Sequence, residues 1–129
     1  MMLFAVTIDC PDPTSLARFY QQFLGGDLHS TNDDFTALTI EGDVRLDFQR
    51  VGNPRPARWP GPAAPRRVHL DFSVDDLDAA EERVLRCGAE LAEHQPGGGR
   101  FRVFLDPAGH PFCLADAESA ALRDESCHL

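Results

Sequence analysis

The feature that most constrains this chain is an internal repeat. Each copy predicts a strand, then a helix that begins after an aspartate and ends at glycine, then three further strands. The second copy follows the first after about 64 residues, a spacing typical of a repeated supersecondary unit. One such unit leaves an apolar face uncovered. The repeat therefore predicts an α+β fold of two tandem βαβββ modules that pack together.

The elements of each copy follow from apolar alternation and from helical spacing of apolar residues. In the first copy we expect strands over 3–9, 27–30, 35–41 and 44–51 and a helix over 13–24. In the second copy we expect strands over 68–75, 90–93, 101–105 and 111–115 and a helix over 77–87. Asp12 and Asp76 are good N-caps for the two helices. The apolar positions predict one buried layer that contains Phe4, Val6, Ile8, Phe19, Phe23, Leu70, Phe72, Val84, Phe112 and Leu114.

A proline-rich stretch separates the two copies. Residues 52–65 hold five prolines, which favour extended backbone over regular strands. The length of 129 residues suits one domain. We therefore expect a single domain over 1–117, with module one at about 1–51, a linker over 52–65 and module two at about 66–117. Residues 118–129 form a C-terminal tail.

Composition limits the classes of partner. The net charge is −9, with 21 acidic against 12 basic residues, which argues against nucleic acid and against an anionic membrane surface. No apolar run is long enough for a membrane helix, and no secretory signal is recognisable at the start. The four cysteines are widely spaced and form no CxxC motif, so we expect reduced thiols in the cytoplasm.

Polar side chains alternate with the apolar ones on the first strand of each copy. Thr7 and Asp9 lie on the non-core face of the first such strand, and His69, Asp71 and Ser73 on that of the second. If the two strands lie side by side, these groups converge. A carboxylate next to an imidazole fixes its tautomer, so His69 and Asp71 are candidate catalytic residues. A polar binding cluster and a solvated outer strand face are the alternatives.

Three stretches resemble the vicinal oxygen chelate superfamily, which contains the glyoxalase and bleomycin-resistance proteins and related dioxygenases. "HLDFSVDDLDAA" at 69–80 is similar to the start of the second module in these proteins, and "FYQQFLG" at 19–25 to the first helix. "FLDPAGHPFCL" at 104–114 is similar to their last hairpin. The resemblance covers roughly residues 3–116 and is greatest to the glyoxalase-like subgroup. It implies two βαβββ modules whose curved sheets enclose a cavity.

The resemblance also implies positions for a metal. Relatives that use a divalent cation hold it with four ligands, typically His, Glu, His and Glu. The four positions fall here on Ala5, on Gln49 (or Asp47), on His69 and on Cys113. Ala5 has no donor atom, so we expect neither the usual four-ligand site nor a cofactor. A divalent metal held by His69 with Gln49 or Asp47 and Cys113 is the alternative.

The function expected from these features is the binding or sequestering of a small polar or cationic molecule in a pocket between the modules. Its expected ligand-binding residues are Thr7, Asp9, Asp47, Gln49, His69, Asp71, Ser73 and Cys113. The alternatives are a metal-dependent lyase, isomerase or dioxygenase of glyoxalase type and a metal-free enzyme that uses His69 and Asp71. The resemblance further implies a homodimer.

Overall fold

The structure of the protein is a computed structural model that describes residues 1–42, 44–52 and 68–121. The chain divides into two compact units, Met1–Pro56 and Ala57–Leu129, and each has its own four-stranded sheet. Most of the predicted linker and of the predicted tail lies outside the described residues. Within the described part of the chain, none of the helices has the length and apolar character needed to cross a membrane.

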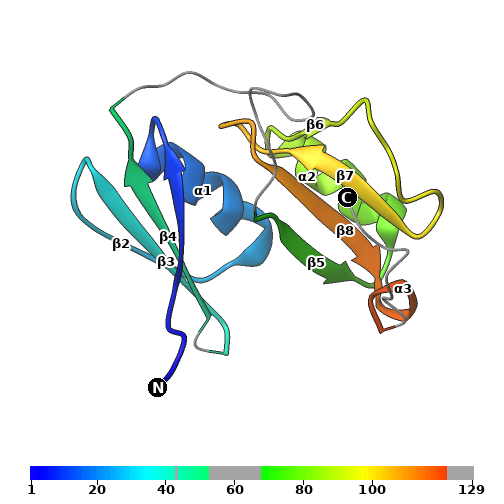
Figure 1. Ribbon diagram of the computed structural model, residues 1–129, viewed down its shortest axis with the longest axis horizontal. Coiled ribbons are helices and arrows are strands. Elements are labelled where there is room, and N and C mark those ends of the chain that lie inside the picture. The colour runs from blue at the N-terminus through cyan, green and yellow to red at the C-terminus, as the bar shows by residue number, and fades with distance from the viewer. Residues whose placement is uncertain (43, 53–67, 122–129) are drawn as a thin grey trace. The chain divides into compact units, whose positions relative to one another are not determined.

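Within its described residues the first unit contains one helix and four strands, whose arrangement Figure 1 shows. Its elements are β1 (Val6–Cys10), α1 (Pro13–Leu24), β2 (Asp27–Asn32), β3 (Phe35–Ile40) and β4 (Val44–Arg50). The strand order is β1-β4-β3-β2. β1 runs parallel to β4, and the other neighbours are antiparallel. The first and last strands of the unit are therefore hydrogen-bonded to each other.

The second unit repeats this arrangement and adds a short helix. Its elements are β5 (Leu70–Val74), α2 (Leu77–Arg86), β6 (Glu90–Leu91), β7 (Phe101–Leu105), β8 (Pro111–Asp116) and α3 (Ala117–Ala121). The strand order is β5-β8-β7-β6, with β5 parallel to β8. The other two pairings are antiparallel. The predicted pair of βαβββ modules is thus confirmed, with the same topology in both.

The helices begin where the sequence predicts. The Asp12 side chain accepts a hydrogen bond from the Ser15 backbone N–H at 3.2 Å, and Asp76 accepts one from the Ala79 N–H at 3.0 Å. Each bond satisfies a backbone donor that the first turn of a helix leaves unpaired. After α1 the chain turns at Gly25, whose φ of 74° favours a residue without a Cβ.

Each helix covers one face of its sheet. In the first unit the Thr14 hydroxyl of α1 lies 3.2 Å from the Thr36 hydroxyl of β3, and Tyr20 stacks on Phe48 of β4. In the second unit Arg102 of β7 binds Asp78 at 2.8 Å, a residue of α2. Thr36, Phe48 and Arg102 therefore face the helix of their unit. Because side chains alternate along a strand, the residues next to each of them on its strand lie on the opposite face of the sheet. This face, away from the helix, is called the open face of each sheet here.

Aromatic residues fill the layer between helix and sheet. Phe48 of β4 and Phe112 of β8 are both fully buried. Phe48 stacks on Tyr20 with ring centroids 5.8 Å apart, and Phe112 stacks on Phe104 at 5.6 Å. Phe72 meets Phe112 edge to face at 6.0 Å. The predicted register of β5, with Phe72 toward the core, therefore holds.

One member of the predicted layer is wrong. Phe4 lies before the first residue of β1 and is 66% exposed. The Arg45 guanidinium lies 5.4 Å from the centre of its ring. The alternation in the sequence extends through Phe4, but the strand pairing begins only at Val6, opposite Leu46. Phe4 therefore covers a charged side chain on the open face and takes no part in the core.

Truncation of the buried rings tests this assignment of the core. Phe48→Ala and Phe112→Ala should each lower the free energy of unfolding by about 3–5 kcal/mol, because each leaves a cavity beside a stacked ring. Leu85→Ala is the control, since Leu85 is 40% exposed on α2, and it should cost less than about 1 kcal/mol. Urea denaturation followed by circular dichroism gives all three values. Equal, small losses in the three variants would contradict the assignment.

Candidate functional site

The second unit brings three potential ligands together. His69, Asp71 and Cys113 each offer one donor atom, and these atoms all lie within 4.8 Å of one another. These three residues are called the His–Asp–Cys cluster here. Among the described residues, their donor atoms lie close enough together to hold a metal ion.

Strand register explains how the cluster forms. His69 immediately precedes β5, and Asp71 lies two residues further on the same face of the strand. Cys113 is the direct register partner of Asp71 in the parallel ladder between β5 and β8, which lie side by side (Figure 1). Leu70 and Phe112, one step earlier, point to the helix face. All three cluster residues therefore lie on the open face of the second sheet.

The imidazole and the carboxylate are in direct contact. His69 Nε2 lies 3.3 Å from Asp71 Oδ2, and the two side chains are 21% and 30% exposed. The Nε2 atom itself is buried and has no hydrogen-bond partner. The contact therefore has the distance of an ion pair without the alignment of an N–H···O bond. A buried ring nitrogen without a hydrogen-bond partner is costly, so it calls for a specific cause such as a catalytic role or a bound water or ion.

The thiol lies at the border between the polar pair and an apolar cluster. Cys113 is 1% exposed and packs with Phe101, Val103, Leu105, Ala92 and Ala115, and Ala120 of α3 packs against this set. An apolar environment disfavours a free thiolate, whereas a bound metal deprotonates a coordinating thiol. The cluster thus combines a buried sulfur with a partly exposed carboxylate and imidazole.

The remaining predicted residue of the second unit extends the polar edge. Ser73 lies two residues beyond Asp71 on the open face of β5 and is exposed. Its register partner is Ala115, which belongs to the apolar cluster. The open face of this sheet is therefore polar along β5 and apolar along β7 and β8.

In the first unit the predicted residues occupy equivalent positions. Thr7 and Asp9 are exposed on the open face of β1, where their register partners are Asp47 and Gln49. Ala5 lies just before β1 and, as an alanine, has no donor atom. The first unit thus carries two polar pairs but lacks a histidine at the position equivalent to His69.

The Asp47 carboxylate is occupied by a neighbour on its own strand. Arg45 donates from Nε to one oxygen at 2.6 Å and from Nη2 to the other at 2.9 Å. The Asp47 side chain is only 6% exposed, whereas that of Arg45 is 36% exposed. Hydrogen bonding to Asp47 is the main cause that raises the pKa of Arg45 above its ordinary value. Both carboxylate oxygens therefore already have a cationic partner.

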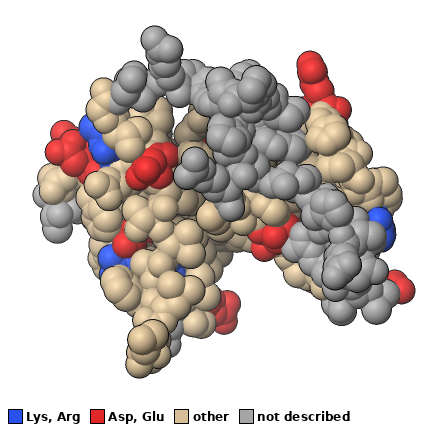
Figure 2. All heavy atoms as spheres, in the orientation of Figure 1, with Lys and Arg blue, Asp and Glu red and all other residues tan. Residues whose placement is uncertain are grey.

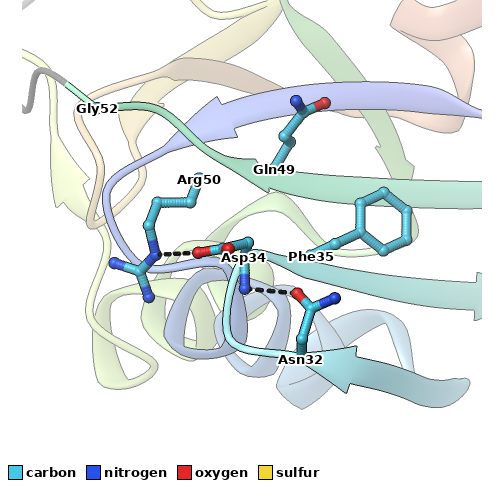
Figure 3. A pocket seen from close by; sticks show the side chains of 6 residues that line it. All are labelled: Asn32, Asp34, Phe35, Gln49, Arg50 and Gly52. Carbon is cyan, nitrogen blue, oxygen red and sulfur yellow. Dashed lines mark hydrogen bonds and ion pairs between the residues drawn. The ribbon is translucent and has the colours of Figure 1, made fainter.

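Gln49 lies beside a hollow in the first unit, near the turn between β2 and β3. The hollow has a volume of about 600 Å³ and is lined by Asn32, Asp34, Phe35, Gln49, Arg50 and Gly52 (Figure 3). Gln49 and Arg50 point in opposite directions from β4 (Figure 3). The Arg50 guanidinium binds Asp34 at 3.2 Å and the backbone oxygens of Pro11 and Asp33 at 2.6 and 3.0 Å. This arginine holds the turn together, so its donors are engaged within the protein.

Charged side chains are spread out on the face of the described residues drawn in Figure 2. Figure 2 shows acidic side chains scattered over the drawn face, with fewer basic ones between them. Among the described residues visible there, the acidic groups form no continuous patch. The chemistry of the second unit therefore depends on the local His–Asp–Cys cluster more than on the overall charge of −9.

Comparison with known proteins agrees with this architecture. A family model described as "Glyoxalase-like domain" matches residues 5–115, which span both sheets. The chain belongs to this family of glyoxalase-like domains. No match was found among curated proteins.

Solved structures share the fold at low sequence identity. A glyoxalase/bleomycin resistance protein/dioxygenase family enzyme from Burkholderia phytofirmans is 21% identical, with a TM-score of 0.66 over 90% of this chain and 98% of that one. A glyoxalase-related enzyme from Fulvimarina pelagi is 19% identical, with a TM-score of 0.64 over 92% and 89%. A mutant of the fosfomycin resistance protein FosX from Listeria monocytogenes, complexed with Mn(II) and a dihydroxypropylphosphonic acid, is 20% identical, with a TM-score of 0.66 over 88% and 90%. These likenesses establish the vicinal oxygen chelate fold.

Sequence reasoning named all three members of the cluster among the expected ligand-binding residues, but it did not predict that Asp71 and Cys113 are direct neighbours. It paired His69 with Asp71 as an acid–base pair, and it placed His69 and Cys113 with Gln49 or Asp47 in the alternative metal site. The missing step was the register between β5 and β8. The equivalence of the two modules does not reveal it, because the first unit has Thr7 and Gln49 where the second has Asp71 and Cys113.

Loss of the Arg45 guanidinium tests the structural role assigned to Asp47. Arg45→Gln should lower the midpoint of thermal unfolding, because it leaves a buried carboxylate without its cation. Arg18→Gln is the matched control, since Arg18 is exposed on α1, and it should leave the midpoint within the error of measurement. Differential scanning calorimetry compares the two variants. A midpoint unchanged in Arg45→Gln would mean that the pair contributes nothing to stability.

Proposed function

We propose that the protein binds a small polar or cationic molecule at the open face of the second sheet, with His69 and Asp71 as its polar contacts. The observation that carries this proposal is the buried Nε2 atom of His69, which has no hydrogen-bond partner although it faces a carboxylate at 3.3 Å. A bound group that donates a hydrogen bond or carries positive charge would stabilise both side chains.

The surroundings of the cluster also support a small ligand. Ligand sites combine a few polar groups with a mostly apolar lining. Here the apolar residues Phe101, Val103 and Ala115 lie on the same face of the sheet as the polar pair. The partial exposure of His69 and Asp71 leaves them accessible from solvent. Two partly exposed polar side chains therefore border a buried apolar cluster on one face.

Binding measurements on variants test the proposal. A panel of small amines, quaternary ammonium compounds and polyols is screened by thermal shift, and a binder is then measured by calorimetry. Asp71→Asn and His69→Ala should each weaken its binding roughly 10- to 100-fold, the cost of losing a hydrogen bond to a charged group.

Asp75→Asn is the control for this experiment. It makes the same change of charge at an exposed bend four residues away, and it should leave the affinity unchanged. If a binder from the panel keeps its affinity in both Asp71→Asn and His69→Ala, the binding site lies elsewhere and the proposal is refuted.

The contact between His69 and Asp71 favours one second candidate, a metal-free enzyme that uses this pair. A carboxylate orients an imidazole for general acid–base catalysis. The fold also occurs in proteins described as enzymes, such as the Burkholderia phytofirmans relative. Turnover that persists in chelator-treated protein and is lost in His69→Gln would support this candidate over simple binding.

We also propose that the protein is a homodimer in the cytoplasm. The support for the dimer is the resemblance to family members that pair. The support for the location is that the described cysteines, Cys10, Cys87 and Cys113, form no disulfide with one another, as expected in a reducing compartment. Sedimentation velocity at micromolar concentration tests the dimer, and a single monomeric species would refute it.

A further inference from the structure

We infer that the hollow of the first unit is a second binding site, and that it takes an uncharged planar heteroaromatic ring of the nucleobase type. The hollow lies near the turn between β2 and β3, and its volume of about 600 Å³ suits a small molecule (Figure 3). All of its lining residues belong to the first unit. The inference therefore depends neither on the His–Asp–Cys cluster nor on the ligand proposed for the second sheet.

One row of residues across the first sheet brings an aromatic ring and two carboxamides together. Phe35 of β3 is the register partner of Gln49 on β4 and of Asn32 on β2. Directly opposite residues of antiparallel strands point to the same face, so all three lie on the open face, and all three line the hollow. Simple alternation would place Asn32 on the helix face with Ser30, but the register shifts between these two residues and turns Asn32 to the open face.

The Phe35 ring stands apart from the aromatic core. Tyr20 and Phe48 stack on each other on the helix face of the same sheet. Among the described residues, no other aromatic ring contacts that of Phe35, which is half-buried at the hollow. Planar heteroaromatic rings stack on such a side chain through their faces, whatever the base. The ring therefore offers the apolar contact of the site.

The two carboxamides beside this ring have hydrogen-bonding capacity to spare. Asn32 Oδ1 accepts a hydrogen bond from the Asp34 backbone N–H at 2.8 Å, which fixes the orientation of the amide and leaves its NH2 group to donate elsewhere. Within the described part of the chain, the Gln49 side chain makes no hydrogen bond. A carboxamide presents a donor beside an acceptor, and this pair matches the hydrogen-bonding edge of a nucleobase.

The charged residues of the hollow favour an uncharged ligand. Arg50 Nε binds Asp34, and the two other guanidinium nitrogens donate to backbone oxygens, so a phosphate would have to displace one of these bonds. Asp9 is the register partner of Gln49 and adds a carboxylate to the same row. The net charge of −9 opposes a polyanion such as nucleic acid, whereas it does not oppose a free base or nucleoside.

A saccharide fits these observations less well. Sugars also pack against aromatic side chains, but their many hydroxyls need more partners than two carboxamides supply. The remaining polar side chains of the hollow, Asp34 and Arg50, already bind each other. A base presents one flat face and one polar edge, which are the two features that this row of residues can contact.

NMR titration of the full, isotope-labelled chain tests the site. Adenine and adenosine are the probes, and glucose and adenosine monophosphate are the comparisons. We expect saturable shifts of the side-chain amide signals of Asn32 and Gln49 with both probes, and weaker binding of the monophosphate because of its charge. Absence of these shifts with both probes overturns the inference. Tighter binding of glucose or of the monophosphate than of adenosine also overturns it.

Near-isosteric variants assign the contacts and keep the turn intact. Asn32→Asp retains the oxygen that accepts the Asp34 N–H but loses the NH2 donor, and Gln49→Glu loses the corresponding donor on β4. Each should weaken adenosine binding about fivefold or more, the effect of losing one hydrogen bond. Phe35→Leu keeps an apolar side chain without a ring to stack on, and it should weaken binding by a similar factor.

Gln22→Glu is the matched control, because it makes the same change of group and charge as Gln49→Glu. Gln22 is exposed on α1, which covers the opposite face of the sheet, so the control should leave the adenosine affinity unchanged. Circular dichroism establishes that each variant folds. Unchanged affinity in Asn32→Asp, Gln49→Glu and Phe35→Leu would place the bound ring elsewhere and overturn the inference. An equal loss of affinity in Gln22→Glu and Gln49→Glu would do the same, since it would reduce the effect to net charge.

Discussion

The parallel pairing between the first and last strand of each module is the interaction on which the rest of the structure depends. A parallel pair cannot be joined by a tight turn, so the helix and the two intervening strands make the crossover. The helix then covers one face of the sheet and fixes which residues of the paired strands point into the core. On the other face the register places Thr7 beside Asp47 and Asp71 beside Cys113. The candidate site is thus a consequence of the ladder.

The two modules use the same frame for different chemistry. In the first, a buried carboxylate on the last strand receives two hydrogen bonds from Arg45, so the module supplies its own cation. In the second, the position equivalent to Arg45 in the repeat is Gly109, which has no side chain. The carboxylate of the second module, Asp71, lies on the first strand of its module, β5, and not on the last. Its neighbour on the last strand, β8, is Cys113. The Asp71 carboxylate contacts an imidazole instead, with His69 Nε2 3.3 Å from Asp71 Oδ2.

Sequence patterns predicted what depends on local chemistry, and they missed what depends on pairing between distant strands. The capping of α1 by Asp12 and of α2 by Asp76 is a local signal, so both helices begin where expected. Alternation also oriented Phe72 and Asp71 correctly. The exposure of Phe4 escaped prediction because the start of β1 is set by its pairing with β4. The direct pairing of Asp71 with Cys113 was not predicted for the same reason, although both were expected in one binding site, since the register between β5 and β8 cannot be read from either segment alone.

A cluster built within one module behaves differently from a site shared between two. In a shared site the distances between the side chains depend on the packing of the modules, whereas His69, Asp71 and Cys113 are positioned by a single sheet. The geometry of the His–Asp–Cys cluster therefore depends on the pairing of β5 with β8 and not on the association of the modules.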